Sequence, residues 1–92
     1  MYTISAKLTF RIPHAAALKD KRRVCRSLTA RARQRFNASV AEVDTQDLHR
    51  TLTIGVALVS ESAGHARRSL DEIIRFMEEG HEDAELTGAE II

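Results

Sequence analysis

The residues of this sequence with the clearest chemical potential are basic and lie close together. Eight of the fourteen lysine and arginine residues fall between positions 18 and 36. An array of ammonium and guanidinium groups can neutralise successive phosphates of a nucleic acid. At helical spacing several of these cations share one arc, and they are the candidate RNA-binding residues: Lys19, Arg22, Arg23, Arg26 and Arg33.

An amphipathic helix over residues 18–36 is needed to hold these cations. Its apolar residues recur at intervals of three, four and seven, which is typical of one buried helix face. They are Leu18, Cys25, Leu28, Ala32 and Phe36. Arg23 lies further round the helix than the other candidates, so it is expected to contribute less to RNA binding. Lys21 falls on the apolar arc, so we expect it to snorkel there or to pair with Asp44 or Asp47.

The net charge of +1 hides an asymmetry between the two halves of the chain. Residues 1–40 carry ten basic residues and one acidic residue, a net +9, whereas residues 41–92 carry four basic and twelve acidic residues, a net −8. Such a split indicates either a surface for an anionic partner or two halves that neutralise each other.

Alternating and helical patterns place the remaining elements in one domain, residues 1–92. Strands are predicted at 2–12, 38–44, 50–60 and 84–92, with a second helix at 63–79. The order β-α-β-β-α-β favours a ferredoxin-like two-layer α+β fold with sheet order 4-1-3-2. Right-handed crossovers put both helices on one face of the antiparallel sheet.

One core is expected between the helices and the sheet. Its predicted members are Tyr2, Ile4, Leu8, Phe10, Leu28, Phe36, Ile54, Val56, Leu58, Leu70, Ile73 and Met77. The opposite sheet face is left uncovered, with small side chains at Gly55 and Ala57. This predicts a homodimer joined through the open sheet face.

Several segments together resemble a known family. They are the run Ala-Leu-Lys-Asp-Lys-Arg-Arg at 17–23 and the stretches 35–43, 46–48 and 54–60. Over roughly residues 8–79 the chain is similar to the YlxP-like family of small bacterial proteins, a domain of unknown function. The resemblance implies a ferredoxin-like fold and a cytoplasmic bacterial protein whose gene often neighbours those of transcription-elongation, translation-initiation and ribosome-maturation factors. Ala17 and His49 depart from the serine and the aromatic residue expected there.

The sequence offers no catalytic constellation, and neither an enzyme nor a cofactor is expected. The link after the first strand, residues 13–17, contains no glycine for a phosphate loop. The single cysteine, Cys25, excludes a paired-cysteine site and is expected to be a small buried residue. His14, His49 and His81 would share an edge of the fold, but their spacing matches no metal-binding pattern, so no metal is predicted. No apolar run approaches the roughly 20 residues of a membrane span.

Two functions of different classes remain open. The first is a non-enzymatic RNA-binding accessory protein, associated with ribosome maturation or translation, whose basic first helix contacts phosphates. The alternative is a homodimeric protein-interaction module with no direct contact to nucleic acid. The start of the chain lacks the pattern of a signal peptide, so cytoplasmic residence is expected for both.

Overall fold

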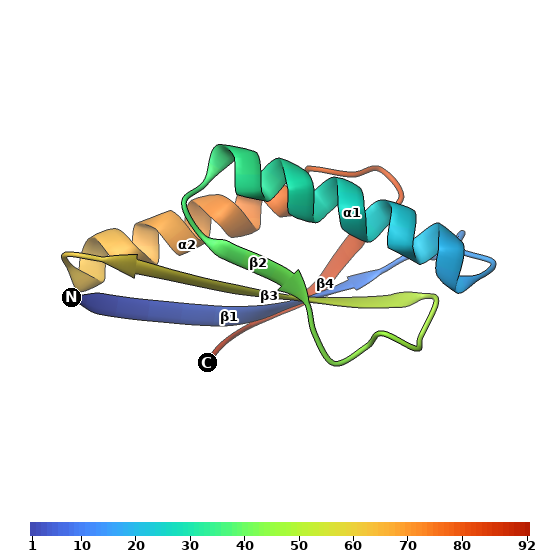
Figure 1. Cartoon of the computed structure of the whole chain (residues 1–92), viewed down its shortest axis with the longest axis horizontal. Helices are drawn as coiled ribbons and strands as arrows, with labels where there is room; N and C mark the ends of the chain where they lie inside the picture. The colour runs from blue at the N-terminus through green and yellow to red at the C-terminus, as the bar shows by residue number, and fades with distance from the viewer.

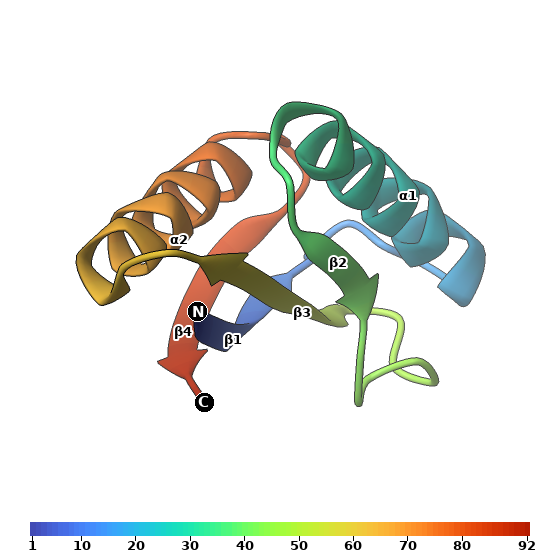
Figure 2. The ribbon, with the colours of Figure 1, turned by 60° about the vertical axis from the view of Figure 1, so that its left-hand side comes forward.

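Two helices and four strands form two layers. The computed structural model describes residues 1–92. The elements are β1 (Tyr2–Arg11), α1 (Leu18–Arg35), β2 (Ser39–Glu42), β3 (Thr51–Ser60), α2 (Ala63–Glu78) and β4 (Glu85–Ile91). The antiparallel sheet has the order β2-β3-β1-β4, which is the predicted order read from the other edge. Both helices lie on one side of the sheet (Figures 1 and 2), so the ferredoxin-like fold is confirmed.

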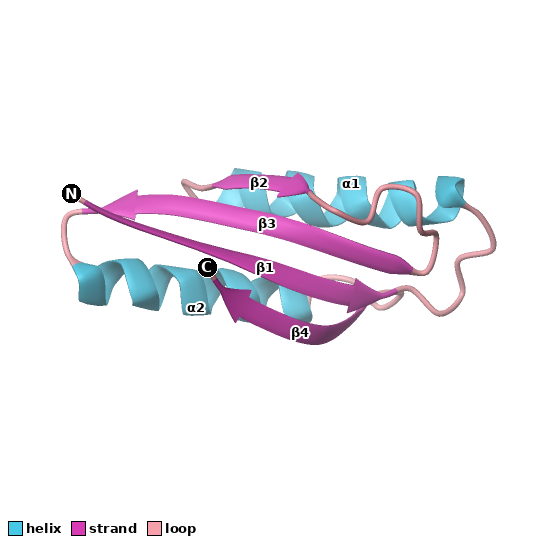
Figure 3. Ribbon diagram, turned by 90° about the horizontal axis from the view of Figure 1, so that it is seen from below, coloured by secondary structure: helices cyan, strands magenta, loops and turns pink.

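The pairing of β1 with β3 sets which side chains meet the helices. Lys7 lies opposite Gly55 and Leu8 opposite Ile54 in an unbroken antiparallel register. Because side chains alternate along a strand, the even-numbered residues of both strands face the helices and the odd-numbered residues face outward. Seen from below, the sheet lies in front of both helices with no element covering it (Figure 3).

The core agrees with most of the prediction. Leu8, Phe10, Leu28, Ile54 and Met77 are almost fully buried. Further buried hydrophobic residues are Ala6, Ile12, Ala15, Val24, Ala32, Val40, Leu52, Val56, Leu58, Ala66, Leu70, Ile73 and Ala84. One predicted member is wrong and two are only partly right. Tyr2 is 51% exposed because it pairs with Ser60 at the very end of the sheet, and Ile4 and Phe36 pack at the margin of the core.

The start of α1 is capped by an unexpected group. Ala17 stands at the N-cap, where the family resemblance leads one to expect a serine, and its methyl group cannot accept a capping hydrogen bond. Instead, Oδ2 of Asp20 accepts hydrogen bonds from the backbone N–H groups of Ala16, at 2.9 Å, and Ala17, at 3.2 Å. This is the acidic half of a capping box, so a carboxylate three residues inside the helix replaces the missing serine.

The second strand is shorter than predicted. β2 ends at Glu42, and two residues later Asp44 has a φ of 65°. That left-handed conformation is uncommon outside glycine, asparagine and aspartate, and it turns the chain away from the sheet. Neither helix is long and apolar enough to cross a membrane.

Candidate nucleic-acid interface

The exposed side of α1 carries the predicted cations. The buried residues of this helix are Lys21, Val24, Leu28, Thr29 and Ala32, and they face the sheet. The candidates Lys19, Arg22, Arg23, Arg26 and Arg33 are all exposed. The helix is therefore held to the sheet by one side and presents its positive charges on the other.

Few of these charges are neutralised within the molecule. The structure contains three ion pairs: Lys7 with Asp44, Lys21 with Glu42, and Arg67 with Asp71. Of the eight cations between positions 18 and 36, only Lys21 has a carboxylate partner. Apart from Glu42, no acidic residue of the second half of the chain forms an ion pair with the basic helix.

Arg33 differs from the other candidates because it is tied to the sheet. Its Nε donates to the backbone carbonyl of Val40 at 3.0 Å, and its Nη2 donates to the same oxygen. Arg33 thus joins the last turns of α1 to β2. The structure brings Lys19, Arg22, Arg23 and Arg26 together on the first half of the helix and sets Arg33 apart at the edge of the sheet.

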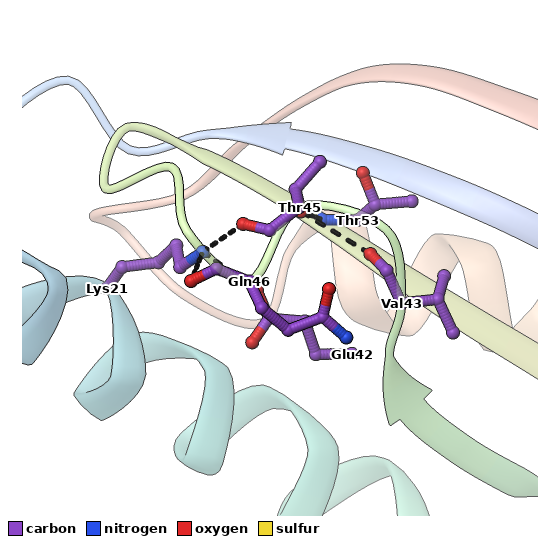
Figure 4. A network of polar contacts seen from close by, with 6 residues as sticks. All are labelled: Lys21, Glu42, Val43, Thr45, Gln46 and Thr53. Atoms are coloured by element: carbon purple, nitrogen blue, oxygen red, sulfur yellow. Dashed lines mark hydrogen bonds and ion pairs between the residues drawn. The ribbon is translucent and has the colours of Figure 1, made fainter.

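Lys21 belongs to the interior of the protein and not to the surface array. Its side chain is fully buried, and its Nζ lies 2.8 Å from Glu42 Oε2. The same ammonium donates to the carbonyls of Thr45, at 2.5 Å, and Gln46, at 3.3 Å (Figure 4). Glu42 Oε2 has no hydrogen bond, so the Lys21 charge is its only close partner.

The predicted partners of Lys21, Asp44 and Asp47, are therefore wrong. The left-handed turn at Asp44 directs its carboxylate to the open sheet face, where it accepts a hydrogen bond from Lys7 Nζ at 2.6 Å. That hydrogen bond, followed by the attraction of the Asp44 charge, raises the pKa of Lys7. Both side chains are about half exposed, so this ion pair contributes little to stability.

Two arginines of α1, Arg31 and Arg35, were not among the predicted site residues, and both contact the second helix. The guanidinium of Arg31 lies 5.8 Å from the ring centre of Phe76, and its Nη1 donates to the carbonyl of Gly80. The guanidinium of Arg35 lies 5.3 Å from Phe76 and 5.7 Å from Phe36. The two rings meet edge to face at 5.4 Å. These arginines link α1 to α2 through cation–π contacts while remaining exposed.

The histidines do not assemble into a metal site. His14 and His81 line a hollow of about 190 Å³ together with Asp20 and Asp83, but His49 is not part of it. Nδ1 of His81 already accepts a hydrogen bond from the backbone N–H of Asp83. No group of three or more histidine, cysteine, aspartate or glutamate side chains is placed to hold a metal ion.

The cysteine is more accessible than predicted but is not activated. Cys25 is half-buried rather than fully buried. Burial, followed by the nearby Glu42 charge, raises the pKa of the thiol and outweighs the opposite effects of Lys21, Arg33 and Arg26. A reactive thiolate would need the reverse balance.

Comparison with known proteins identifies the family and supports the fold. Residues 3–91 match the model of DUF503, a family described as "Protein of unknown function". The chain belongs to this family. It is 31% identical over 64 residues to "Uncharacterized protein YlxP" of Bacillus subtilis (strain 168), and the aligned region covers 70% of each of the two chains. A de novo designed protein with a ferredoxin fold, solved by solution NMR, matches with a TM-score of 0.65 over 99% of this chain and 85% of its own. At 14% identity that likeness concerns the fold alone.

Proposed function

We propose that this protein binds structured RNA through the exposed side of α1 and catalyses no reaction. The observation that carries the proposal is the lack of internal neutralisation: seven of the eight cations between positions 18 and 36 have no carboxylate partner. Unpaired cations held on a rigid element raise the local potential and attract a polyanion. Folded proteins that need surface charge only for solubility usually mix both signs on such a face.

The spacing of these cations suits a phosphate backbone. α1 has 18 residues and is therefore about 27 Å long. Arg22 and Arg26 are four residues apart, so their Cβ atoms lie about 5–6 Å from each other on one side of the helix. Lys19 lies about one turn before Arg22, and Arg23 about one turn before Arg26, in the same half of the helix. Such a cluster can contact several neighbouring phosphates at once.

The mode of recognition follows from what surrounds the cations. The outward residues of β1 are Thr3, Ser5, Lys7, Thr9 and Arg11, so the sheet lacks the aromatic platform on which RNA-recognition motifs stack bases. Phe36 and Phe76 pack against each other under Arg35. Binding would therefore depend on charge and shape, with little readout of base sequence.

The proposal includes a cellular setting. We place the protein in the bacterial cytoplasm, as an accessory factor of ribosome maturation or translation. This setting is supported by the resemblance to the YlxP-like family and by the unpaired cations of α1, which suit a large folded polyanion. The RNA partner would be ribosomal RNA or RNA of similar folded structure.

The test is a binding titration across a salt series with charge-reversed variants. Arg22→Glu with Arg26→Glu should weaken binding to structured ribosomal RNA fragments. For every phosphate that the variant no longer neutralises, the magnitude of the logarithmic salt slope should fall by roughly 0.7 to 0.9. The matched control is Arg67→Glu with Arg68→Glu, which makes the same charge change at exposed positions of α2.

Two outcomes of this titration would refute the proposal. If the α1 double variant binds with the wild-type affinity and salt slope, its cations form only a solvated surface. If both double variants weaken binding equally, the effect reports net charge and not a site on α1. The alternative function, a homodimeric protein-interaction module without nucleic-acid contact, would then take precedence.

A further inference from the structure

We infer that the uncovered face of the sheet binds a second copy of this chain. This open sheet face is formed by the outward residues of the strands. On β3 they are Thr51, Thr53, Gly55, Ala57 and Val59. Both helices lie on the other side of the sheet (Figure 3), and the chain after β2 covers this face only beside Thr53, which is buried. The inference concerns a surface opposite α1 and does not rest on RNA binding.

A mostly apolar hollow on the open sheet face extends to the β2 edge, where Arg33 of α1 also lines it. Its volume is about 690 Å³, and its lining includes Ala41, Val43, Gly55, Ala57 and Ile92. Gly55 lets the Val43 side chain pack closely on the sheet at one side of this hollow, because a Cβ at that position would lie only 3.2 Å from Val43 Cγ1. Exposed apolar patches of this kind on a small domain commonly mark an interaction site.

The same face also carries protruding apolar side chains. Val59 is 61% exposed and Ile92 is 65% exposed. The backbone N–H of Ile92 donates to the carbonyl of Ser5 at 2.9 Å, which fixes the end of the chain beside β1. A two-fold dimer uses one patch on both copies, so that patch must offer both protrusions and a hollow. The open sheet face meets this requirement.

The charges of the open sheet face favour a second copy over a polyanion. Its two cations stand directly opposite acidic residues in the sheet: Lys7 is paired with Glu90 and Arg11 with Glu85 across β1 and β4. Lys7 also binds Asp44 at 2.6 Å. These opposite charges nearly cancel, so two such faces can approach, whereas two α1 surfaces would repel each other.

The size of the face is sufficient for a specific dimer. The strands contain 10, 4, 10 and 7 residues. At about 3.3 Å per residue and about 4.8 Å between strands, the face measures about 500 Å² in projection. Two copies would together bury roughly 1,000 Å² of projected area, without the additional surface of protruding side chains. This value reaches the lower limit of specific interfaces. A dimer of moderate affinity is the expected result.

Pairing through the β2 edge is a less suitable alternative. The β2 carbonyl of Val40 already accepts two hydrogen bonds from Arg33. A guanidinium at this position obstructs the addition of another strand along that edge. Face-to-face packing leaves this contact intact and leaves the α1 surfaces of both copies on the outside.

The test is sedimentation equilibrium of the full chain without nucleic acid, so that its result is independent of RNA binding. The wild type should dimerise at high concentration. Ala57→Glu should raise the dissociation constant of the dimer by about a hundredfold or more, because two-fold symmetry places two carboxylates in the interface. Ala30→Glu, an equal change at an exposed alanine of α1, should leave the dimer unchanged.

A second measurement covers the case in which Ala57→Glu fails to fold. In the wild type, the methyl groups of Ala57 and Val59 should be shielded from a soluble paramagnetic probe at high protein concentration, while the Ala30 methyl is not. Monomeric wild-type protein at every concentration would overturn the inference. So would a dimer whose Ala57 and Val59 methyl groups stay accessible, or a folded Ala57→Glu variant that dimerises normally.

Discussion

Replacement of Lys21 by methionine should destabilise the protein more than any other change to a cation of α1. Lys21 is fully buried, and methionine keeps much of the volume of its stem while removing the charge. The variant leaves Glu42 without its only close cationic partner. It also removes the donor to the carbonyls of Thr45 and Gln46, which anchors the loop after β2 to the helix.

The size of the effect follows from the burial of the two partners. Breaking a buried ion pair by removing one member costs about 3–5 kcal/mol. The Glu42 side chain retains 17% exposure and can be partly solvated, so the lower end, about 3 kcal/mol, is expected. For a domain of this size, that loss lowers the melting temperature by roughly 12–24 °C. RNA affinity of the folded variant should stay close to that of the wild type.

The assay is urea unfolding followed by circular dichroism, with Lys19→Met as the control. Lys19 is exposed on the same helix, so its replacement should change the free energy of unfolding by less than about 0.5 kcal/mol. Adding Glu42→Gln to Lys21→Met should recover part of the lost stability, because it removes the uncompensated carboxylate. A Lys21→Met variant as stable as the Lys19→Met control would refute this account of the buried ion pair.

Two further predictions concern the core and the thiol. Leu28 is 1% exposed between the helix and the sheet, so its replacement by alanine should lower the free energy of unfolding by about 2–5 kcal/mol. An unchanged urea midpoint would show that Leu28 is not part of the core. Because burial raises the pKa of Cys25, the folded protein should contain less thiolate than the unfolded chain at mildly alkaline pH and should react more slowly with iodoacetamide. Because the pKa of Cys25 is higher in the folded protein, the thiol favours the fold at pH values below the pKa of the unfolded thiol, and this contribution is lost as the pH rises through the pKa of the folded thiol. Equal alkylation rates in buffer and in urea would contradict the raised pKa.

The sequence was sufficient for the fold because its elements carry clear periodicity. The strict alternation of residues 2–12 predicts a strand with one buried side, and β1 indeed buries Ala6, Leu8 and Phe10. The spacing of Leu28 and Ala32 likewise predicts the buried side of α1. Tyr2 follows the same alternation yet is exposed, because periodicity does not reveal where the helix layer ends.

The candidate site was only partly predictable, since its details depend on contacts between distant segments. The exposure of Lys19, Arg22 and Arg26 follows from their angles on the helix. The partners of Lys21 cannot be read from those angles, because the left-handed turn at Asp44 decides which loop atoms reach the helix. The stacking of Arg35 on Phe76 requires the packing of α1 against α2, which leaves no local mark in the sequence.

Crosslinking in cells, followed by sequencing of the bound RNA, tests the central claim most directly. Wild-type protein should recover structured RNA, predominantly ribosomal, and Arg22→Glu with Arg26→Glu should lose most of that recovery at equal abundance of folded protein. Arg67→Glu with Arg68→Glu should retain it. Recovery of the same RNA in the same amount by the α1 double variant and the wild type would contradict a nucleic-acid interface on α1.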